Sequence, residues 1–365
     1  MYKKKLKFLP VHEPDLDIKD SESVLKTLKR GEISGSFTPT INLFEKEFAK
    51  FCQSKFAIGV GNGTDALLLA LKSLNLKKNS EIILPAMTWK STLLCVLNLN
   101  LKPILVDIKS DSSNFDLEDL KKKITKNTSV IIGVHLYGNP IDIKNIKKVI
   151  KKRKIILIED AAQAHGAYLE KNKVGSMGKI ACFSFYPGKN LGAYGDAGCI
   201  TTNDSKIAKK LFALRNCGSI GKFNCEENGY NSRLDTLQAS ILRRKLKFLV
   251  SLNNKRKKIA KIYDLNINNR YIEKLKYYPG CVYHQYVIKT SKRRKLIELL
   301  KKNFIQFGFH YPISINKLNI VKRDFKKQKF INAERIAREG ISLPIDPNLK
   351  KSEIKKIYKV VNSLS

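Results

Sequence analysis

The sequence has no long hydrophobic run and contains few histidines. None of its apolar stretches approaches the roughly 20 residues that a membrane-spanning helix needs. The first ten residues are basic, but they lack the apolar stretch and the small-residue cleavage site of a secretory signal. The seven cysteines include no C-x-x-C pair, and the five histidines lack metal-ligand spacing. We therefore expect a cytoplasmic protein in a reducing compartment, with no membrane span, disulfide framework or metal site.

Acidic residues are also scarce, with 32 Asp and Glu against 70 Lys and Arg, which gives a formal net charge of +38. Such a charge raises the possibility of nucleic-acid binding, because basic patches release counterions from a phosphate backbone. The lysines are spread along nearly the whole chain, however, and no helix-turn-helix, zinc-finger or aromatic-rich RNA-binding signature accompanies them. We therefore expect no nucleic-acid partner. The charge would instead help to attract an anionic substrate such as a nucleotide diphosphate.

The first two thirds of the chain alternate between short apolar strands and amphipathic helices. Strands are predicted at 56–60, 81–84, 103–106, 130–134, 155–158, 179–185 and 198–202. Helices are predicted at 21–31, 40–51, 65–74, 91–98, 117–124 and 143–152. This alternation predicts an α/β fold with a mostly parallel central sheet between helices.

A long helical pattern from 234 to about 264 follows, and we expect it to bridge to a smaller α+β domain. The C-terminal strands are predicted at 282–288 and 305–311, and the helices at 292–303, 331–339 and 350–361. The predicted division is a large domain over residues 1–245, which includes the N-terminal helical segment, and a small domain over 246–365.

Two of the predicted strand ends carry groups that can bind a charged ligand. Gly63 and Thr64 open a predicted helix, so their free backbone N–H groups form a natural phosphate site, although a plain strand-to-helix turn also explains them. Asp160 follows the apolar strand 155–158, where burial would be costly without a cationic partner. A protonated pyridine nitrogen would supply that cation. The alternative role for Asp160 is to cap the following turn.

Lys189 follows the predicted strand 179–185, inside a loop that proline and glycine interrupt. One lysine in so basic a chain means little by itself, and a solvated lysine is the ordinary alternative. Ligands of parallel sheets bind beyond the carboxyl ends of the strands, which is where Gly63, Asp160 and Lys189 all fall. A phosphate site, an acid and a lysine in this arrangement are the parts needed to bind pyridoxal phosphate.

Three further residues could complete such a site. Gln163 could donate a hydrogen bond to the phenolic oxygen of the cofactor ring, although a surface position would also suit it. Trp89, the single tryptophan, could stack on the ring face, and ordinary core packing is the alternative. Ser184 could add a hydroxyl to the phosphate site.

Four blocks of the chain, in order, resemble the signature blocks of the DegT/DnrJ family of pyridoxal-phosphate-dependent nucleotide-sugar aminotransferases. The blocks are NGTDAL at 62–67, EDAAQAHGA at 159–167, FSFYPGKNLG at 183–192 and YNSRLDTLQA at 230–239. The resemblance covers essentially the whole chain and implies the fold type I architecture, with a mostly parallel sheet between helices and a smaller C-terminal α+β domain.

The resemblance also implies roles for individual residues. Lys189 would attach to the cofactor, and Asp160 would pair with the pyridine nitrogen. The full cofactor-binding set implied by the family is Gly63, Thr64, Trp89, Asp160, Gln163, Ser184, Lys189 and Asn231. Asn231 matches an asparagine that reaches the phosphate from the neighbouring subunit, which implies at least a homodimer. Some family members are dehydratases with histidine in place of the lysine, so Lys189 favours transamination.

By resemblance the amino donor is L-glutamate and the acceptor is a nucleotide-linked ketosugar. The block at 159–167, the loop 186–192 and the block that contains Asn231 look most like members that act on dTDP-linked 3-keto-6-deoxyhexoses. The segment 10–14 is more similar to 4-keto enzymes such as perosamine synthetases. Aminated deoxysugars commonly enter surface polysaccharides, so the resemblance places the product in lipopolysaccharide or capsule synthesis.

One loop departs from the family pattern. Within residues 310–317, Ser314 stands where many relatives have a second proline, and Asn316 stands where they have histidine. If this loop contacts the sugar, the usual substrate preference does not carry over directly. A non-catalytic, sugar-sensing protein on the same fold is the alternative from another functional class, and the intact Lys189, Asp160 and Gln163 argue against it.

Overall fold

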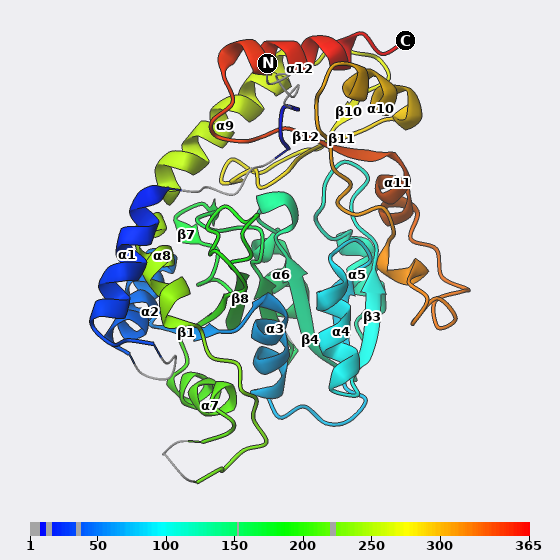
Figure 1. The fold of residues 1–365 in the computed structure, drawn as a ribbon. Coiled ribbons are helices and arrows are strands. Elements are labelled where there is room, and N and C mark those ends of the chain that lie inside the picture. The colour runs from blue at the N-terminus through cyan, green and yellow to red at the C-terminus, as the bar shows by residue number, and fades with distance from the viewer. Residues whose placement is uncertain (1–7, 12–16, 34–37, 152, 220–223) are drawn as a thin grey trace.

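A seven-stranded sheet forms the centre of the protein (Figure 1). The computed structural model describes residues 8–11, 17–33, 38–151, 153–219 and 224–365. The strand order in the sheet is β1-β9-β8-β5-β4-β2-β3. In chain order the strands are β1 (Phe56–Val60), β2 (Glu81–Pro85), β3 (Lys102–Val106), β4 (Thr128–Val134), β5 (Ile156–Asp160), β8 (Ile180–Ser184) and β9 (Gly198–Thr202).

The sheet is mostly parallel, as predicted. Strands β3, β2, β4, β5 and β8 pair in parallel with one another along the sheet. Strand β9 is antiparallel to both of its neighbours, β8 and β1. Strand β1 therefore runs in the same direction as β8, and the carboxyl ends of six strands meet at one edge of the sheet.

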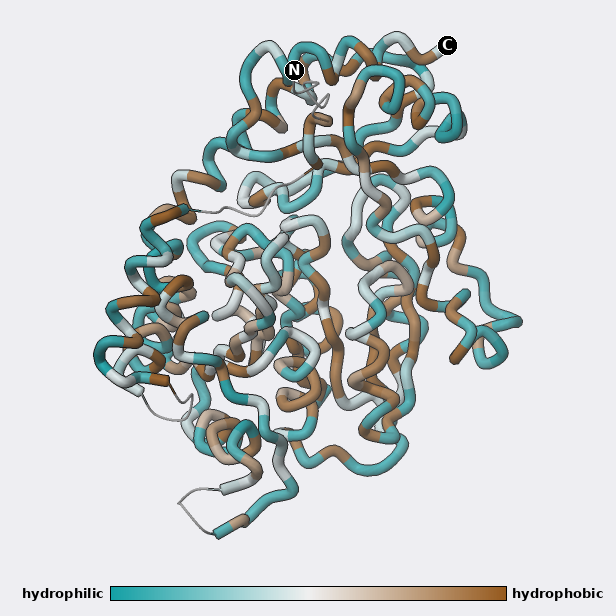
Figure 2. Tube along the Cα trace, in the orientation of Figure 1, coloured by the Kyte–Doolittle hydropathy of each residue, from teal (hydrophilic) through white to brown (hydrophobic). Residues whose placement is uncertain are grey.

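Helices cover both faces of this sheet, because strand side chains alternate between the two faces and both are apolar. One face packs against α3 (Gly63–Lys72), α4 (Lys90–Asn98) and α7 (Ser205–Arg215). The other face packs against α2 (Pro39–Cys52), α5 (Leu117–Lys123), α6 (Ile143–Ile150) and α8 (Thr236–Leu246). Helix α1 (Ile18–Lys29) lies along α8. Figure 2 shows that hydrophobic residues concentrate in the central strands and the helix faces against them.

A smaller unit follows the long helix α9 (Leu249–Asn266), which runs up from the side of the central sheet (Figure 1). It contains an antiparallel sheet of β10 (Glu273–Lys274), β11 (Tyr286–Lys289) and β12 (Gly340–Leu343), with helices α10 (Arg293–Lys302), α11 (Ile331–Glu339) and α12 (Lys351–Asn362). Helices α9, α10 and α12 share one apolar cluster with this sheet, whereas α11 joins the cluster on the large sheet. The predicted domain boundary at residue 245 stays a prediction.

The structure corrects the predicted elements in several places. The helical pattern at 234–264 is two helices, α8 and α9, which residues 247 and 248 separate. The predicted strand 305–311 is wrong, because within the described chain this segment makes just single bridges, from Ile305 to Leu9 and from Gly308 to Ser342. Its alternating aromatic residues pack against the small-unit core without a ladder. The strand predicted at 282–288 begins only at Tyr286, and helix α7 and the strands β10 and β12 were not predicted.

In the part of the chain that the structure describes, no helix is both long and apolar enough to cross a membrane. Two very short strands, β6 (Tyr168–Leu169) and β7 (Asn172–Lys173), form a hairpin between β5 and β8. A 3-10 turn after β4 covers Leu136–Gly138, and another covers Ile315–Lys317.

Glu159 anchors the loop that leads into β8. The side chain is fully buried, and its Oε1 accepts hydrogen bonds from the backbone N–H groups of Met177 at 2.9 Å and Gly178 at 2.7 Å. Its Oε2 accepts one from Gly175 N at 3.2 Å and lies 3.0 Å from His135 Nε2. Since successive strand residues face opposite sides, Glu159 fixes this loop on one face while Asp160 points to the other.

The Glu159→Gln substitution tests this anchoring role. It keeps the side-chain shape but turns an NH₂ group toward backbone donors, so at least one buried N–H loses its acceptor. We expect the free energy of unfolding to fall by about 2–4 kcal/mol. Urea unfolding followed by circular dichroism measures the change. Glu170→Gln is the matched control, because the Glu170 side chain is 69% exposed; an equal effect of both substitutions would refute the role of Glu159.

Candidate active site

The predicted site residues gather at the sheet edge where six strands end. Asp160 is the last residue of β5, and Ser184 is the last residue of β8. Gly63 is the first residue of α3, shortly after β1, and Trp89 precedes α4, shortly after β2. The parallel arrangement therefore brings together residues that lie more than 100 positions apart in the sequence.

The start of α3 presents free backbone donors. The Asn62 side chain accepts a hydrogen bond from Asp65 N at 2.9 Å, which caps the helix. The N–H groups of Gly63 and Thr64 have no acceptor among the described residues. Such N–H groups, together with the positive end of the helix dipole, bind phosphate well.

Ser184 lies directly against this helix start. A Cβ atom at position 63 would come within 2.6 Å of the Ser184 Cβ, so this close approach requires glycine at position 63. The Thr64 hydroxyl lies 2.8 Å from the hydroxyl of Ser91 on α4. Two backbone N–H groups and the hydroxyls of Thr64, Ser91 and Ser184 thus lie at or beside the start of α3, and Ser91 was not predicted as a site residue.

Asp160 is a buried carboxylate with an unusual charge environment. Its Oδ2 accepts a hydrogen bond from Thr92 Oγ1 at 2.9 Å, and its Oδ1 accepts one from Ala162 N at 3.2 Å. Burial raises the pKa of Asp160, and these hydrogen bonds and the positive charge of Lys189 oppose that rise. Because two neutral donors are its hydrogen-bond partners in the described structure, the carboxylate retains the capacity to stabilise a cationic ligand group.

Lys189 lies in the loop after β8, where its backbone N–H bonds to Tyr186 O at 2.8 Å. Burial lowers the pKa of its ammonium to about 8, and the charge of Asp160 opposes this effect. Among the described residues its side chain makes no hydrogen bond or ion pair, although the chain is partly accessible to solvent. Near neutral pH, a larger fraction of Lys189 is therefore a neutral, nucleophilic amine than of an ordinary lysine.

Gln163 and Trp89 are joined through Tyr311. Gln163 Oε1 accepts a hydrogen bond from Tyr137 N at 2.7 Å, and its Nε2 donates to the Tyr311 hydroxyl at 2.8 Å. The Tyr311 ring centre lies 5.1 Å from that of Trp89, and the indole is 48% exposed. Burial raises the pKa of Tyr311, so its phenol stays protonated at neutral pH.

Asn231 does not join these residues within one chain. Its side chain is exposed, and its backbone forms an isolated bridge with Asn216. The next residue, Ser232, donates a hydrogen bond to Asp65 Oδ2 at 2.6 Å and accepts one from Gly61 N at 3.1 Å. The backbone at Asn231 is thus held near the start of α3 while its side chain faces outward.

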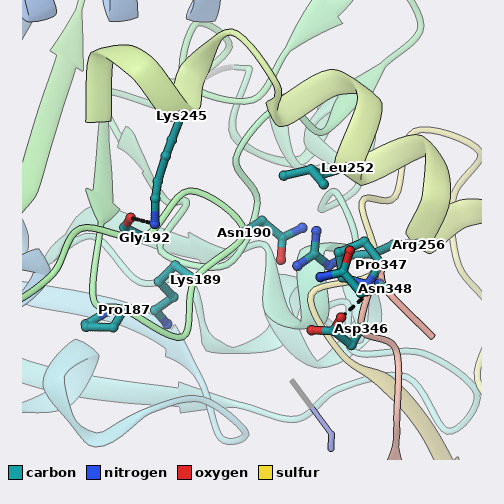
Figure 3. A pocket seen from close by; sticks show the side chains of 10 residues that line it. All are labelled: Pro187, Lys189, Asn190, Gly192, Lys245, Leu252, Arg256, Asp346, Pro347 and Asn348. Carbon is teal, nitrogen blue, oxygen red and sulfur yellow. Dashed lines mark hydrogen bonds between the residues drawn. The ribbon is translucent and has the colours of Figure 1, made fainter. Parts of the chain in front are cut away.

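A pocket lies on the side of the Lys189 loop that faces α8 and α9 (Figure 3). Its lining residues are Pro187, Lys189, Asn190, Gly192, Lys245, Leu252, Arg256, Asp346, Pro347 and Asn348. The second lysine in this pocket, Lys245, donates a hydrogen bond to Gly192 O at 3.1 Å and lies 4.2 Å from the centre of the Tyr194 ring. Lys245 is thus engaged in structural contacts, unlike the Lys189 amine.

The donor set fits pyridoxal phosphate. The α3 start and its hydroxyls suit a phosphate, the buried Asp160 suits a protonated pyridine nitrogen, and the amine of Lys189 suits an aldehyde. Thr92 and Tyr311, which the sequence reasoning did not assign to the site, add a donor to the carboxylate and a ring beside Trp89.

Comparison with known proteins agrees with this assembly. A family model described as the DegT/DnrJ/EryC1/StrS aminotransferase family matches residues 14–362. A protein of Aneurinibacillus thermoaerophilus, dTDP-3-amino-3,6-dideoxy-alpha-D-galactopyranose transaminase, is 39% identical over 321 residues, which are 87% of this chain and 88% of that protein.

Solved structures match over similar lengths. The crystal structure of S. venezuelae DesV in complex with a ketimine intermediate has a TM-score of 0.94 and 32% sequence identity, and the match covers 98% of both chains. NtdA from Bacillus subtilis with bound cofactor PMP has a TM-score of 0.89 and 28% identity, over 99% of this chain and 85% of that one. The predicted fold class and family are both confirmed: this protein belongs to the DegT/DnrJ/EryC1/StrS aminotransferase family.

Proposed function

We propose that this protein is a pyridoxal-phosphate-dependent aminotransferase that moves an amino group from L-glutamate to a dTDP-linked 3-keto-6-deoxyhexose. The observation that carries the proposal is a lysine, Lys189, with a lowered pKa beside the buried Asp160 carboxylate at the strand-end edge. The relative from A. thermoaerophilus, a transaminase of a dTDP-linked 3-amino sugar by name, supports the substrate class.

The phosphate would be held by the start of α3. The N–H groups of Gly63 and Thr64 would donate to it, together with the hydroxyls of Thr64 and Ser184. Asp160 would keep the pyridine nitrogen protonated. Gln163 would donate to the phenolic oxygen, and Trp89 would cover one face of the ring.

When bound, pyridoxal phosphate supplies an aldehyde that takes up the amine and a protonated ring that withdraws electrons from the substrate carbon. The chain supplies the proton transfers. The Lys189 amine would hold the cofactor until a donor amine displaces it. Lys189 Nζ would then act as the general base that moves the proton from the donor α-carbon to the cofactor carbon C4′, a role for which a pKa of about 8 is well suited.

The proposal includes a homodimer, in which Asn231 of one subunit reaches the phosphate of the other. Its exposed side chain and the firmly held backbone at Ser232 support this role. Helix α1 also exposes apolar side chains, with Ile18 80% and Leu25 56% exposed, that a second subunit could cover. We place the enzyme in the cytoplasm, in agreement with its seven free cysteines, and assign its product to surface-polysaccharide synthesis.

The altered loop 310–317 would influence the choice of sugar if it contacts the substrate, and its Tyr311 also borders the proposed cofactor site. Ser314 and Asn316 are both buried, and Asn316 Nδ2 donates a hydrogen bond to Glu334 on α11 at 2.9 Å. Ser314 and Asn316 therefore affect the packing of the loop that carries Tyr311. The segment 10–14, which resembles 4-keto enzymes, lies mostly outside the described residues.

A spectroscopic assay tests the substrate. The loaded enzyme is treated with glutamate and then mixed with dTDP-4-keto-6-deoxyglucose, with and without a 3,4-ketoisomerase. We expect the yellow absorbance to return only when the isomerase is present, because the isomerase converts the 4-keto sugar into the 3-keto sugar. Return without it would mark a 4-aminotransferase. A loaded protein that no donor or ketosugar changes would be a sugar-sensing relative. Lys189→Ala is the control and should show no turnover.

A pH profile tests the state of Lys189. Burial lowers the pKa of the amine to about 8, so its neutral fraction increases as the pH rises through 8. The initial rate at which the apo-protein attaches pyridoxal phosphate should rise with the same midpoint and then level off. An ordinary lysine would give a midpoint at a pH of about 10.4. Stopped-flow absorbance at several pH values measures the profile, and a midpoint near that of an ordinary lysine would contradict the burial argument.

A further inference from the structure

The residue after Lys189 is held by an unusually complete set of hydrogen bonds. Asn190 is buried, and its Nδ2 donates to Asn253 Oδ1 at 2.9 Å and to Val282 O at 3.1 Å. Its Oδ1 lies 3.1 Å from His284 Nδ1. Since an amide oxygen only accepts, His284 must carry its proton on Nδ1 in this contact. Both donors and the oxygen of the Asn190 amide are therefore used.

Asn253 extends these contacts to the other half of the site. It is buried on α9, and its Nδ2 donates to His165 O at 2.9 Å. His165 belongs to the turn after Asp160, the same turn that carries Gln163. One asparagine side chain thus connects the loop of Lys189 with the turn that follows Asp160.

The position of Asn253 along α9 gives this connection a rigid support. Leu249, one turn earlier, packs in the apolar cluster of Phe185 and α8. Ile259 and Tyr263, further along the same helix, pack in the cluster of the small unit. Asn253 lies between these two anchored segments, so its backbone is held in place. Figure 3 shows Asn190 turned toward α9 while Lys189 leaves the loop in another direction.

We propose that Asn190, Asn253 and His284 are positioning residues that hold the amine of Lys189 in place relative to Asp160. The proposal rests on the proposed function in one respect, namely that Lys189 is the residue that attaches the cofactor. These three side chains use their hydrogen bonds on one another and on backbone carbonyls, so they act through the loop and the turn. Loss of one member leaves a buried amide group unpaired and frees the loop.

The test compares Asn253→Leu with Asn254→Leu, because Asn254 is the exposed neighbour on the same helix. The first readout is the rate at which each apo-protein attaches pyridoxal phosphate. We expect Asn253→Leu to reduce it by about tenfold or more, since small misplacements of a reacting group cost one to two orders of magnitude. Asn254→Leu should stay within about twofold of the unmodified protein, as surface substitutions usually do.

A second readout does not depend on the cofactor. Formaldehyde and cyanoborohydride methylate neutral lysine amines, and peptide mass spectrometry reports the rate at each lysine of the apo-protein. At pH 8, Asn253→Leu should slow methylation of Lys189 relative to the exposed Lys171, because a freed loop lets water stabilise the ammonium. Asn254→Leu should leave this ratio unchanged.

A conservative pair at His284 separates positioning from simple stability. His284→Phe removes the N–H that faces Asn190, whereas His284→Asn places an amide N–H close to the position of Nδ1. We expect His284→Phe to behave like Asn253→Leu, and His284→Asn to restore most of the attachment rate. If circular dichroism shows that Asn253→Leu does not fold, the comparison of His284→Phe with His284→Asn tests the proposal instead.

The proposal is overturned if the Lys189 attachment and methylation rates of folded Asn253→Leu and His284→Phe match those of Asn254→Leu. If the unmodified protein attaches pyridoxal phosphate at no lysine, the proposed function fails instead, and the methylation ratio still decides whether these residues position Lys189.

Discussion

The burial of the Asp160 carboxylate at the end of β5 is the constraint on which the candidate site depends. Removing a carboxylate from water is costly, and hydrogen bonds from Thr92 and Ala162 offset just part of that cost. The same low-dielectric surroundings lower the pKa of the Lys189 amine. Both groups therefore lie where a ligand with a cationic ring nitrogen and an aldehyde would stabilise them, as the proposed function requires.

The fold makes this preparation possible. Parallel strands end at one edge, so a carboxylate from β5, a hydroxyl from β8 and the helix start after β1 converge without a dedicated domain. The antiparallel strand β9 fills the space between β8 and β1, and glycine at position 63 lets α3 approach Ser184. Glu159, on the opposite face of β5 from Asp160, fixes the loop before β8 and thereby the register of the strand that leads to Lys189.

Much of this arrangement could be predicted from the sequence, and the exceptions have physical causes. The strands at 56–60 and 198–202 were located to the residue, since each is a short apolar run between turn residues. The placement of Asp160 and Lys189 at strand ends followed from the βα alternation. The strand expected at 305–311 failed because its alternating aromatic residues pack into a core without strand partners, and period-two patterns do not show which partner is present.

The missed site residues could not be found from local patterns. Thr92 reaches Asp160 and Tyr311 reaches Gln163 through contacts between segments far apart in the chain, and neither residue type is distinctive where it stands. The amide contacts of Asn190 with Asn253 and His284 are likewise tertiary. Such contacts decide how firmly the reactive lysine is held. The reactive residues of the site were therefore easier to predict from the sequence than the residues that hold them in place.

The surroundings of Lys189 set its amine apart from the other lysines of a chain that contains 70 Lys and Arg residues. The most direct measurement is to load the intact protein with pyridoxal phosphate, reduce it with borohydride and identify the labelled peptides by mass spectrometry. We predict one pyridoxyl group per chain, on Lys189. Label on Lys245, which lines the same pocket, or label spread over many surface lysines would contradict it.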